Sequence, residues 1–239
     1  MGRAARTILL VLALALTAAA PAARAQYARP AAKVLARARA ASGGNAWNYL
    51  RGWHETGAVD GAAYERWLDP LRYGMREEIH DASGGVSVRG FNGAGAWRID
   101  AAGQATGGGE PTLVRPERTD AFFGVYAFFY TSRFDARGRM VGARKAGGKA
   151  FDVVEVEPWG GTPRELWFDR KTGLLSRIVD RTGARPVTTE LSDYRKAGPL
   201  KVAFRFVSDD GAPAGHAVRQ VQSLDFAPPD RSMFGLPRS

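Results

Sequence analysis

The histidines and carboxylates of this chain are the residues that could support catalysis or bind a metal ion. His54, His80 and His216 are far apart in the sequence and lack the short spacing of metal ligands, so each is interpreted as a strand or turn histidine. Cysteine is absent, which excludes thiol catalysis, disulfides and cysteine-based zinc sites. The common motifs of serine hydrolases, phosphate-binding loops and zinc proteases are also missing. We therefore predict no enzyme activity, no catalytic residues, no metal and no cofactor.

One segment resembles a catalytic motif. Residues 180–184, Asp-Arg-Thr-Gly-Ala, are similar to the Asp-Thr-Gly-Ala of retroviral-type aspartic proteases, but Arg181 is inserted where that motif tolerates no extra residue. Residues 174–179 and 187–194 on either side have the composition of β-strands. We interpret the segment as the turn of a hairpin.

Glu77 is the carboxylate that is hardest to place on a surface. If residues 72–80 form a regular strand, Glu77 lies on the same face as Tyr73, Met75 and Ile79. A buried and unpaired carboxylate is costly, so it would need an arginine partner or a wet cavity. A bulge that turns Glu77 outward is an equally good interpretation.

An aromatic segment interrupts the polar sequence between Asp120 and Arg133, where no residue is charged. A helix that starts near Pro116 and ends before Gly138 would be apolar nearly all round, so it must be buried or line an apolar cavity. We predict that this segment and three residues of the sheet form such a cavity, with Glu77 as a polar group within it. The predicted cavity and lid residues are Phe122, Phe123, Tyr126, Phe129, Tyr130, Tyr73, Met75 and Trp97.

The rest of the chain is predicted to be mainly β. Residues 30–41 have helical spacing and a Ser-Gly-Gly stop, and a Gly-rich connector is expected at 101–110. Apolar and polar residues alternate in many other segments, which indicates an antiparallel sheet with one covered face. About a dozen strands are too many for a flat sheet, so we expect a curved sheet or half-open β-barrel whose concave face is plugged by helices. The predicted strands are residues 53–59, 64–68, 72–80, 86–91, 96–100, 140–145, 151–157, 164–168, 174–181, 187–194, 202–207 and 217–226.

The N-terminus has the layout of a secretory signal. Arg3 and Arg6 precede an apolar run at residues 8–20, and residues 23–25 are Ala-Arg-Ala. The run is too short to cross a bilayer, which takes about 20 residues. We predict cleavage near Ala25 and export to the periplasm, which leaves residues 26–239 as a single domain.

The net charge of +10 falls to +7 without Arg3, Arg6 and Arg24. Basic and acidic residues alternate and form no basic block, so nucleic acid is not an expected partner. No segment outside the signal is apolar enough to cross a membrane, although peripheral contact with anionic headgroups is compatible with the sequence.

Several turn motifs resemble the LolA/LolB-like family of outer-membrane lipoprotein-sorting proteins. They are residues 167–174 (Trp-Phe-Asp-Arg-Lys-Thr-Gly-Leu), 193–196 (Asp-Tyr-Arg-Lys) and 198–205 (Gly-Pro-Leu-Lys-Val-Ala-Phe-Arg), with Ala203 where proline is common. Residues 40–47, 90–93 and 226–229 also resemble domains that precede retropepsin-like aspartic proteases, although the protease domain itself is absent here. The resemblance implies a curved antiparallel sheet, helices on its concave side and an apolar cavity for acyl chains.

Two functions remain open on these grounds. The first is a periplasmic, non-enzymatic carrier or binder of a lipid or lipoprotein acyl chain, held between the sheet and the aromatic segment. The second is a structural or protein-interaction module of the cell envelope, in which the aromatic residues are only core.

Overall fold

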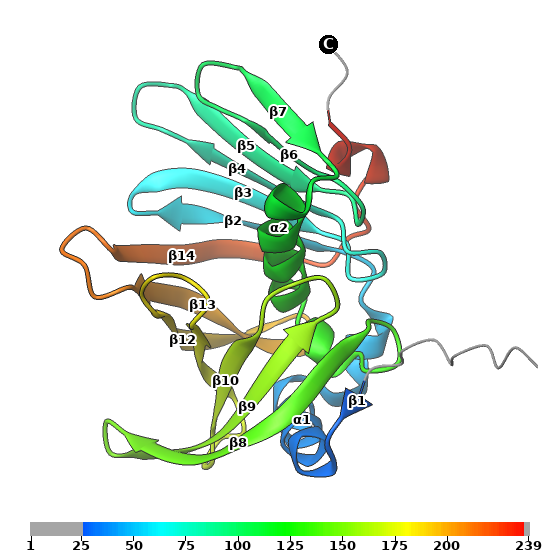
Figure 1. Ribbon diagram of the computed structural model, residues 1–239, viewed down its shortest axis with the longest axis vertical. Coiled ribbons are helices and arrows are strands. Elements are labelled where there is room, and N and C mark those ends of the chain that lie inside the picture. The colour runs from blue at the N-terminus through cyan, green and yellow to red at the C-terminus, as the bar shows by residue number, and fades with distance from the viewer. Residues whose placement is uncertain (1–25, 237–239) are drawn as a thin grey trace, which may run out of the picture.

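The protein is built on one large curved sheet with helices on its concave side (Figure 1). The computed structural model describes residues 26–236, so the predicted signal at 1–25 lies outside the described residues. The strand order is β1-β8-β9-β10-β11-β12-β13-β14-β2-β3-β4-β5-β6-β7. Neighbouring strands are antiparallel except β1 and β8, and the sheet ends at β1 and β7 without closing. The predicted fold class is confirmed.

The strands follow the hairpin pattern of the sequence from one end of the chain to the other. Their bounds are β1 Gln26–Tyr27, β2 Trp53–Val59, β3 Ala62–Leu68, β4 Met75–His80, β5 Val86–Phe91, β6 Ala96–Ile99, β7 Ala105–Gly108, β8 Ala136–Ala146, β9 Lys149–Pro158, β10 Arg164–Asp169, β11 Leu175–Asp180, β12 Val187–Ala197, β13 Leu200–Asp209 and β14 His216–Asp225. The helical elements are α1 Arg29–Ser42, η1 Gly44–Tyr49, α2 Pro111–Gly124, η2 Ala127–Phe129 and η3 Arg231–Phe234.

The predicted strands are all present, with small corrections at their ends. The segment at 180–184 is a hairpin turn, since Asp180 pairs with Val187 across β11 and β12. The strand predicted at 72–80 begins only at Met75, because Tyr73 has φ 69° and turns the chain between β3 and β4. The connector predicted at 101–110 contains the edge strand β7, whose Gly107 packs against Trp97.

The aromatic segment is not one continuous helix, which corrects the prediction. Helix α2 begins at Pro111, where proline suits the first turn, so Pro116 lies inside it. The helix ends at Gly124, and Tyr126 takes up a left-handed conformation (φ 54°) before the short helix η2. A segment that is apolar on every side has no distinct apolar face. Its sequence therefore gives no periodic signal for the residue at which the helix ends.

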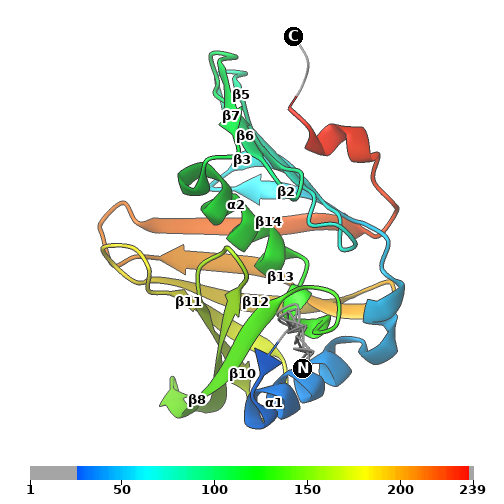
Figure 2. The ribbon, with the colours of Figure 1, turned by 45° about the vertical axis from the view of Figure 1, so that its right-hand side comes forward.

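The aromatic residues of this segment fill the concave side of the sheet. The rings of Tyr126 and Phe129 both lie 5.1 Å from Trp47, which follows α1. The ring of Phe128 is fully buried against Phe168 of β10. Figure 2 shows α2 crossing the concave side, and α1 packs nearby against η2, β8 and β13. No helix within residues 26–236 is long and apolar enough to cross a membrane.

Helix η3 covers the opposite, convex face of the sheet near β4 to β6 (Figure 2). The indole N–H of Trp97 donates a 2.8 Å hydrogen bond to the carbonyl of Phe234 at the end of η3. The neighbouring strand leaves room for this ring, since a Cβ on Gly90 would lie 2.2 Å from the indole. Trp97 therefore faces away from the concave side and joins the C-terminal segment to the sheet.

Substitution Gly90→Ala is expected to destabilise the fold by about 2 kcal/mol, because the added methyl group overlaps a rigid indole that is fixed by its hydrogen bond. Gly109→Ala is the matched control, since a Cβ there meets no atom within 4 Å. Urea unfolding monitored by tryptophan fluorescence measures both variants. Equal midpoints for the two variants would contradict the packing described here.

Candidate functional site

The sheet has two halves, one formed by β2 to β7 and the other by β1 and β8 to β14. A row of charged side chains crosses the concave face of the half formed by β2 to β7. We call it the charge ladder, and it consists of one residue on each of five adjacent strands, namely Glu55, Arg66, Glu77, Arg89 and Arg98. The strand register places each of them directly opposite the next. Glu55, Arg66 and Glu77 are all less than 10% exposed. Acid and base alternate from Glu55 to Arg89, and Glu117 of α2 lies between Arg89 and Arg98. This pairing offsets much of the cost of burying charge, because each carboxylate has a guanidinium beside it.

Glu77 is at the centre of the charge ladder and is bound from both sides. Its carboxylate accepts a 2.9 Å hydrogen bond from Arg89 and a 2.7 Å hydrogen bond from Arg219 of β14. The Nε of Arg66 lies 3.4 Å away. Strand β4 pairs regularly with both neighbours, so there is no bulge, and arginine pairing is how the structure accommodates Glu77.

Helix α2 places two more carboxylates on the charge ladder. Glu117, 1% exposed, accepts hydrogen bonds from Arg89 and Arg98 at 3.2 and 2.6 Å. Asp120 lies one turn further along α2 and accepts from Arg89 at 2.7 Å. The same carboxylate accepts from Arg164 of β10 at 2.8 Å, so Asp120 links the two halves of the sheet. These contacts fix how far α2 stands from the sheet.

Two carboxylates of this network, Glu77 and Asp120, are charged at neutral pH. Burial by itself would raise the pKa of Glu77, but Arg89, Arg219 and Arg66 outweigh it and hold that pKa at about 2. Arg89 and Arg164 likewise hold the pKa of Asp120 well below its ordinary value against the effect of burial. A general acid or base needs a pKa near the working pH, and the arginines move both carboxylates away from it. In the part of the chain that the structure describes, no three His, Asp or Glu side chains are grouped to hold a metal ion.

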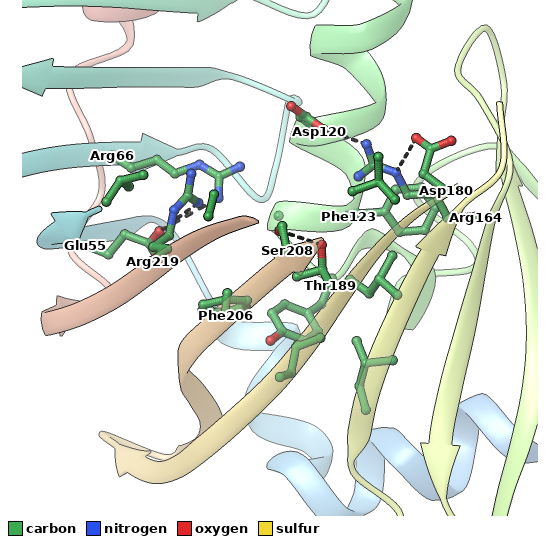
Figure 3. A pocket seen from close by; sticks show the side chains of 18 of the residues that line it. Glu55, Arg66, Asp120, Phe123, Arg164, Asp180, Thr189, Phe206, Ser208 and Arg219 are labelled. Carbon is green, nitrogen blue, oxygen red and sulfur yellow. Dashed lines mark hydrogen bonds and ion pairs between the residues drawn. The ribbon is translucent and has the colours of Figure 1, made fainter. Parts of the chain in front are cut away.

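A cleft of about 380 Å³ lies between the charge ladder, the end of α2 and the second half of the sheet (Figure 3). Its volume falls within the range of small-molecule sites, about 300 to 1,000 Å³. One wall is charged and includes Glu55, Arg66 and Arg219, with Arg164 between Asp120 and Asp180 near the helix. The other wall is mainly apolar and includes Phe123, Tyr126, Leu175, Ile178, Leu191 and Phe206, together with the hydrogen-bonded hydroxyls of Thr189 and Ser208. The cleft is therefore amphipathic.

Two of the predicted cavity residues, Phe123 and Tyr126, line this cleft. Phe122, Phe129 and Tyr130 are buried in the aromatic core, and the ring of Tyr73 packs against Phe122 and Phe134 at its edge. Met75 is buried beneath Arg66, with its sulfur 3.6 Å from that guanidinium. Trp97 is on the convex face, and Glu77 is enclosed behind the arginines that line the cleft. The structure thus brings the aromatic residues together, mostly as core.

Sequence reasoning missed the other members of the charge ladder. The sequence did contain a signal for them. Every second residue of a strand points to the same face, and this alternation puts a charged residue on one face of each predicted strand, namely Glu55, Arg66, Arg89 and Arg98 as well as Glu77. Their alignment depends on the registers of four successive hairpins, and a shift of one residue would turn a strand's charge to the other face. The rest of the apolar wall was missed because β11 to β13 come from the other half of the sheet.

This chain is similar to known proteins in structure and not in sequence. The sequence matches no protein-family model, and no curated protein is significantly similar to it. A LolA superfamily protein from Nitrosomonas europaea superimposes with a TM-score of 0.54 at 11% identity, covering 86% of this chain and 97% of the other. An outer membrane lipoprotein-sorting protein domain from Vibrio parahaemolyticus superimposes with a TM-score of 0.52 at 14% identity, covering 82% and 92%.

The chain has the LolA/LolB-like fold. A DUF1329 family protein from Desulfovibrio piger shares it as well, with a TM-score of 0.54, 11% identity, and 83% and 94% coverage. These similarities confirm the expectation drawn from the turn motifs at 167–174 and 198–205, which lie in the hairpins of β10 to β13. At such low identity the LolA/LolB-like fold is shared without a transferable set of site residues.

Substitution Glu77→Gln is expected to destabilise the protein by about 3 to 5 kcal/mol at pH 7, because it removes the buried carboxylate that binds Arg219 and one of the three carboxylates that bind Arg89. Glu78→Gln is the matched control. Glu78 faces the other side of the sheet and binds Arg76, and its loss should cost about 1 kcal/mol.

The destabilisation by Glu77→Gln should also depend on pH. The carboxylate of Glu77 has a pKa of about 2 when folded and 4.5 as the reference value, so its contribution is complete above about pH 4.5 and is lost as the pH falls towards 2. Urea unfolding of wild type and variant should show their difference falling by roughly half between pH 6 and pH 3. A difference that stays constant over this range would mean that Glu77 is not a buried anion.

Proposed function

We propose that this chain is an exported, non-enzymatic carrier or binder of a lipid or of a lipoprotein acyl chain, which it holds in the amphipathic cleft. The observation that carries the proposal is the cleft itself, about 380 Å³ in volume with an apolar wall on one side. An acyl chain is attracted to such a wall because each buried CH₂ contributes about 0.8 kcal/mol. Arg219 and Arg66 on the opposite wall suit the polar end of the same molecule.

The fold supports this proposal. The LolA superfamily protein and the outer membrane lipoprotein-sorting domain superimpose on this chain over 86% and 82% of its length. Export and cleavage near Ala25 are part of the proposal, and residues 26–239 would then act as one periplasmic domain. Peripheral contact with a membrane is also proposed, since a lipid carrier must exchange its cargo with a bilayer.

A second function is favoured by a separate observation. Six aromatic residues between 122 and 130 pack on one another and on Trp47, and only Phe123 and Tyr126 of these line the cleft. Core packing alone would explain why this segment is aromatic, and a structural or protein-interaction module would need nothing more. In that case the cleft would bind no apolar ligand.

The cleft can be filled without disturbing the core. Ala217 of β14 lines the cleft and is partly exposed, so Ala217→Trp is expected to occupy the space of an acyl chain. Binding of a fluorescent fatty-acid probe, followed by titration, should weaken at least about tenfold, which corresponds to about 1.4 kcal/mol. His216→Trp is the control, because the adjacent residue of the strand points to the opposite face.

These titrations separate the two functions. Tight probe binding by wild type and by His216→Trp, with weak binding by Ala217→Trp, supports the carrier. A wild-type protein that does not bind the probe would contradict the carrier and leave the interaction module. Equal binding by all three proteins would place the probe outside the cleft.

A further inference from the structure

The guanidinium of Arg66 is the member of the charge ladder whose donors are least satisfied. Arg66 is 8% exposed, yet among the described residues its Nε has no hydrogen-bond partner. The carboxylates of Glu77 and Glu55 lie 3.4 and 3.8 Å away without forming hydrogen bonds to it. Its single side-chain hydrogen bond is to the sulfur of Met75, a weak acceptor, at 3.6 Å. A guanidinium carries five N–H donors, and most of those of Arg66 form no hydrogen bond to a described residue.

The carboxylates around the cleft cannot easily turn to Arg66, because other donors already hold them. Glu55 accepts from the indole of Trp53 at 2.8 Å and from the hydroxyl of Tyr64 at 3.3 Å. Asp120 accepts from two arginines at 2.7 and 2.8 Å. Asp180 accepts from Thr182 and Arg164 on the far side of the cleft. The guanidinium of Arg66 is therefore the charged group of the cleft that can still donate hydrogen bonds to a ligand.

The position of Arg66 joins the charged wall to the apolar one. Its Nη2 approaches the end of α2 so closely that a Cβ on Gly124 would lie 2.7 Å from it. Tyr126 and Phe123 line the cleft on either side of this glycine, and Arg219 is the next cation along the wall (Figure 3). Burial raises the pKa of Tyr126, so its phenol stays protonated and adds no competing negative charge. A group bound at Arg66 therefore lies at the polar end of an apolar surface.

We propose that Arg66 binds the anionic head of an amphiphile, a carboxylate or a phosphate ester, whose acyl tail lies on the apolar wall of the cleft. A planar guanidinium matches both anions, because its N–H groups form two parallel hydrogen bonds. Of the described residues that line the cleft, four are arginine and three are carboxylates, so its lining is cationic by one charge. This inference rests on the proposed function and specifies the class of ligand.

The test compares amphiphiles that share a twelve-carbon tail and differ in the head. The probes are dodecanoate, dodecyl phosphate, neutral dodecanol and cationic dodecyltrimethylammonium. Each is titrated calorimetrically at pH 7.5, the ionic probes below their critical micelle concentrations and dodecanol below its solubility limit. Wild type is expected to bind the two anions at least about tenfold more tightly than dodecanol, as a charge-assisted hydrogen bond in a buried site requires. The cation is expected to bind more weakly than dodecanol.

Variants then assign this preference to Arg66. Arg66→Gln should lose the preference for anions while it retains dodecanol binding, and Arg66→Lys should keep part of the preference because the charge remains. Arg29→Gln is the control, since Arg29 is exposed at the start of α1 and should leave all affinities unchanged. If Arg66→Gln does not fold, as judged by circular dichroism, the wild-type comparison and Arg66→Lys still decide the question.

The outcomes distinguish the two levels of the proposal. If none of the four amphiphiles binds, the proposed function fails. If all four bind equally, or if Arg66→Gln keeps the full preference, the cleft binds tails and the anion site at Arg66 is wrong. The two anionic probes distinguish the sources, because stronger binding of dodecanoate indicates a free fatty acid and stronger binding of dodecyl phosphate indicates a phospholipid head.

Discussion

The pairing of carboxylates with guanidinium groups along the charge ladder is the constraint on which the concave side depends. Each of the five strands β2 to β6 contributes one charge to the same row, so a change of register in the hairpins from β2 to β5 would bury a charge without its partner. Buried ion pairs seldom stabilise a fold more than apolar residues of the same size would. Their consequence here is geometric, since they determine which strands lie side by side and where α2 can rest.

Helix α2 depends on this row in turn. Glu117 and Asp120 are held by Arg89, Arg98 and Arg164, and these bonds set the helix at a fixed height above the sheet. Beyond Glu117 and Asp120, the last turn of α2 and the following Tyr126 border an open cleft. The aromatic residues beyond Tyr126 fill the remaining concave space with ordinary packing. The cleft is thus the place where a polar half and an apolar half of the concave face meet.

Local pattern predicted the sheet well and the site poorly. Strands such as Trp53–Val59 and Val86–Phe91 were predicted at their observed ends, because turn residues and alternating apolar positions are local signals. Glu77 was recognised as a problem for the same reason, and one of its two interpretations, an arginine partner, is what the structure shows. The identity of those partners is not local. Arg89 is one hairpin away, whereas Arg219 is at the other end of the chain. The break at Tyr126 could not be foreseen, because aromatic residues on all sides of a helix give no periodic signal for its end.

The central claim is that the cleft holds one amphiphile, and native mass spectrometry of the protein tests it most directly. The protein would be purified from the envelope fraction of its host without detergent, and its mass compared before and after organic extraction. We expect one bound molecule per chain, which organic extraction removes. The extract should then contain an acyl compound with an anionic head. A spectrum that shows only the bare chain, both as purified and after incubation with lipid extract of the same cells, would contradict it.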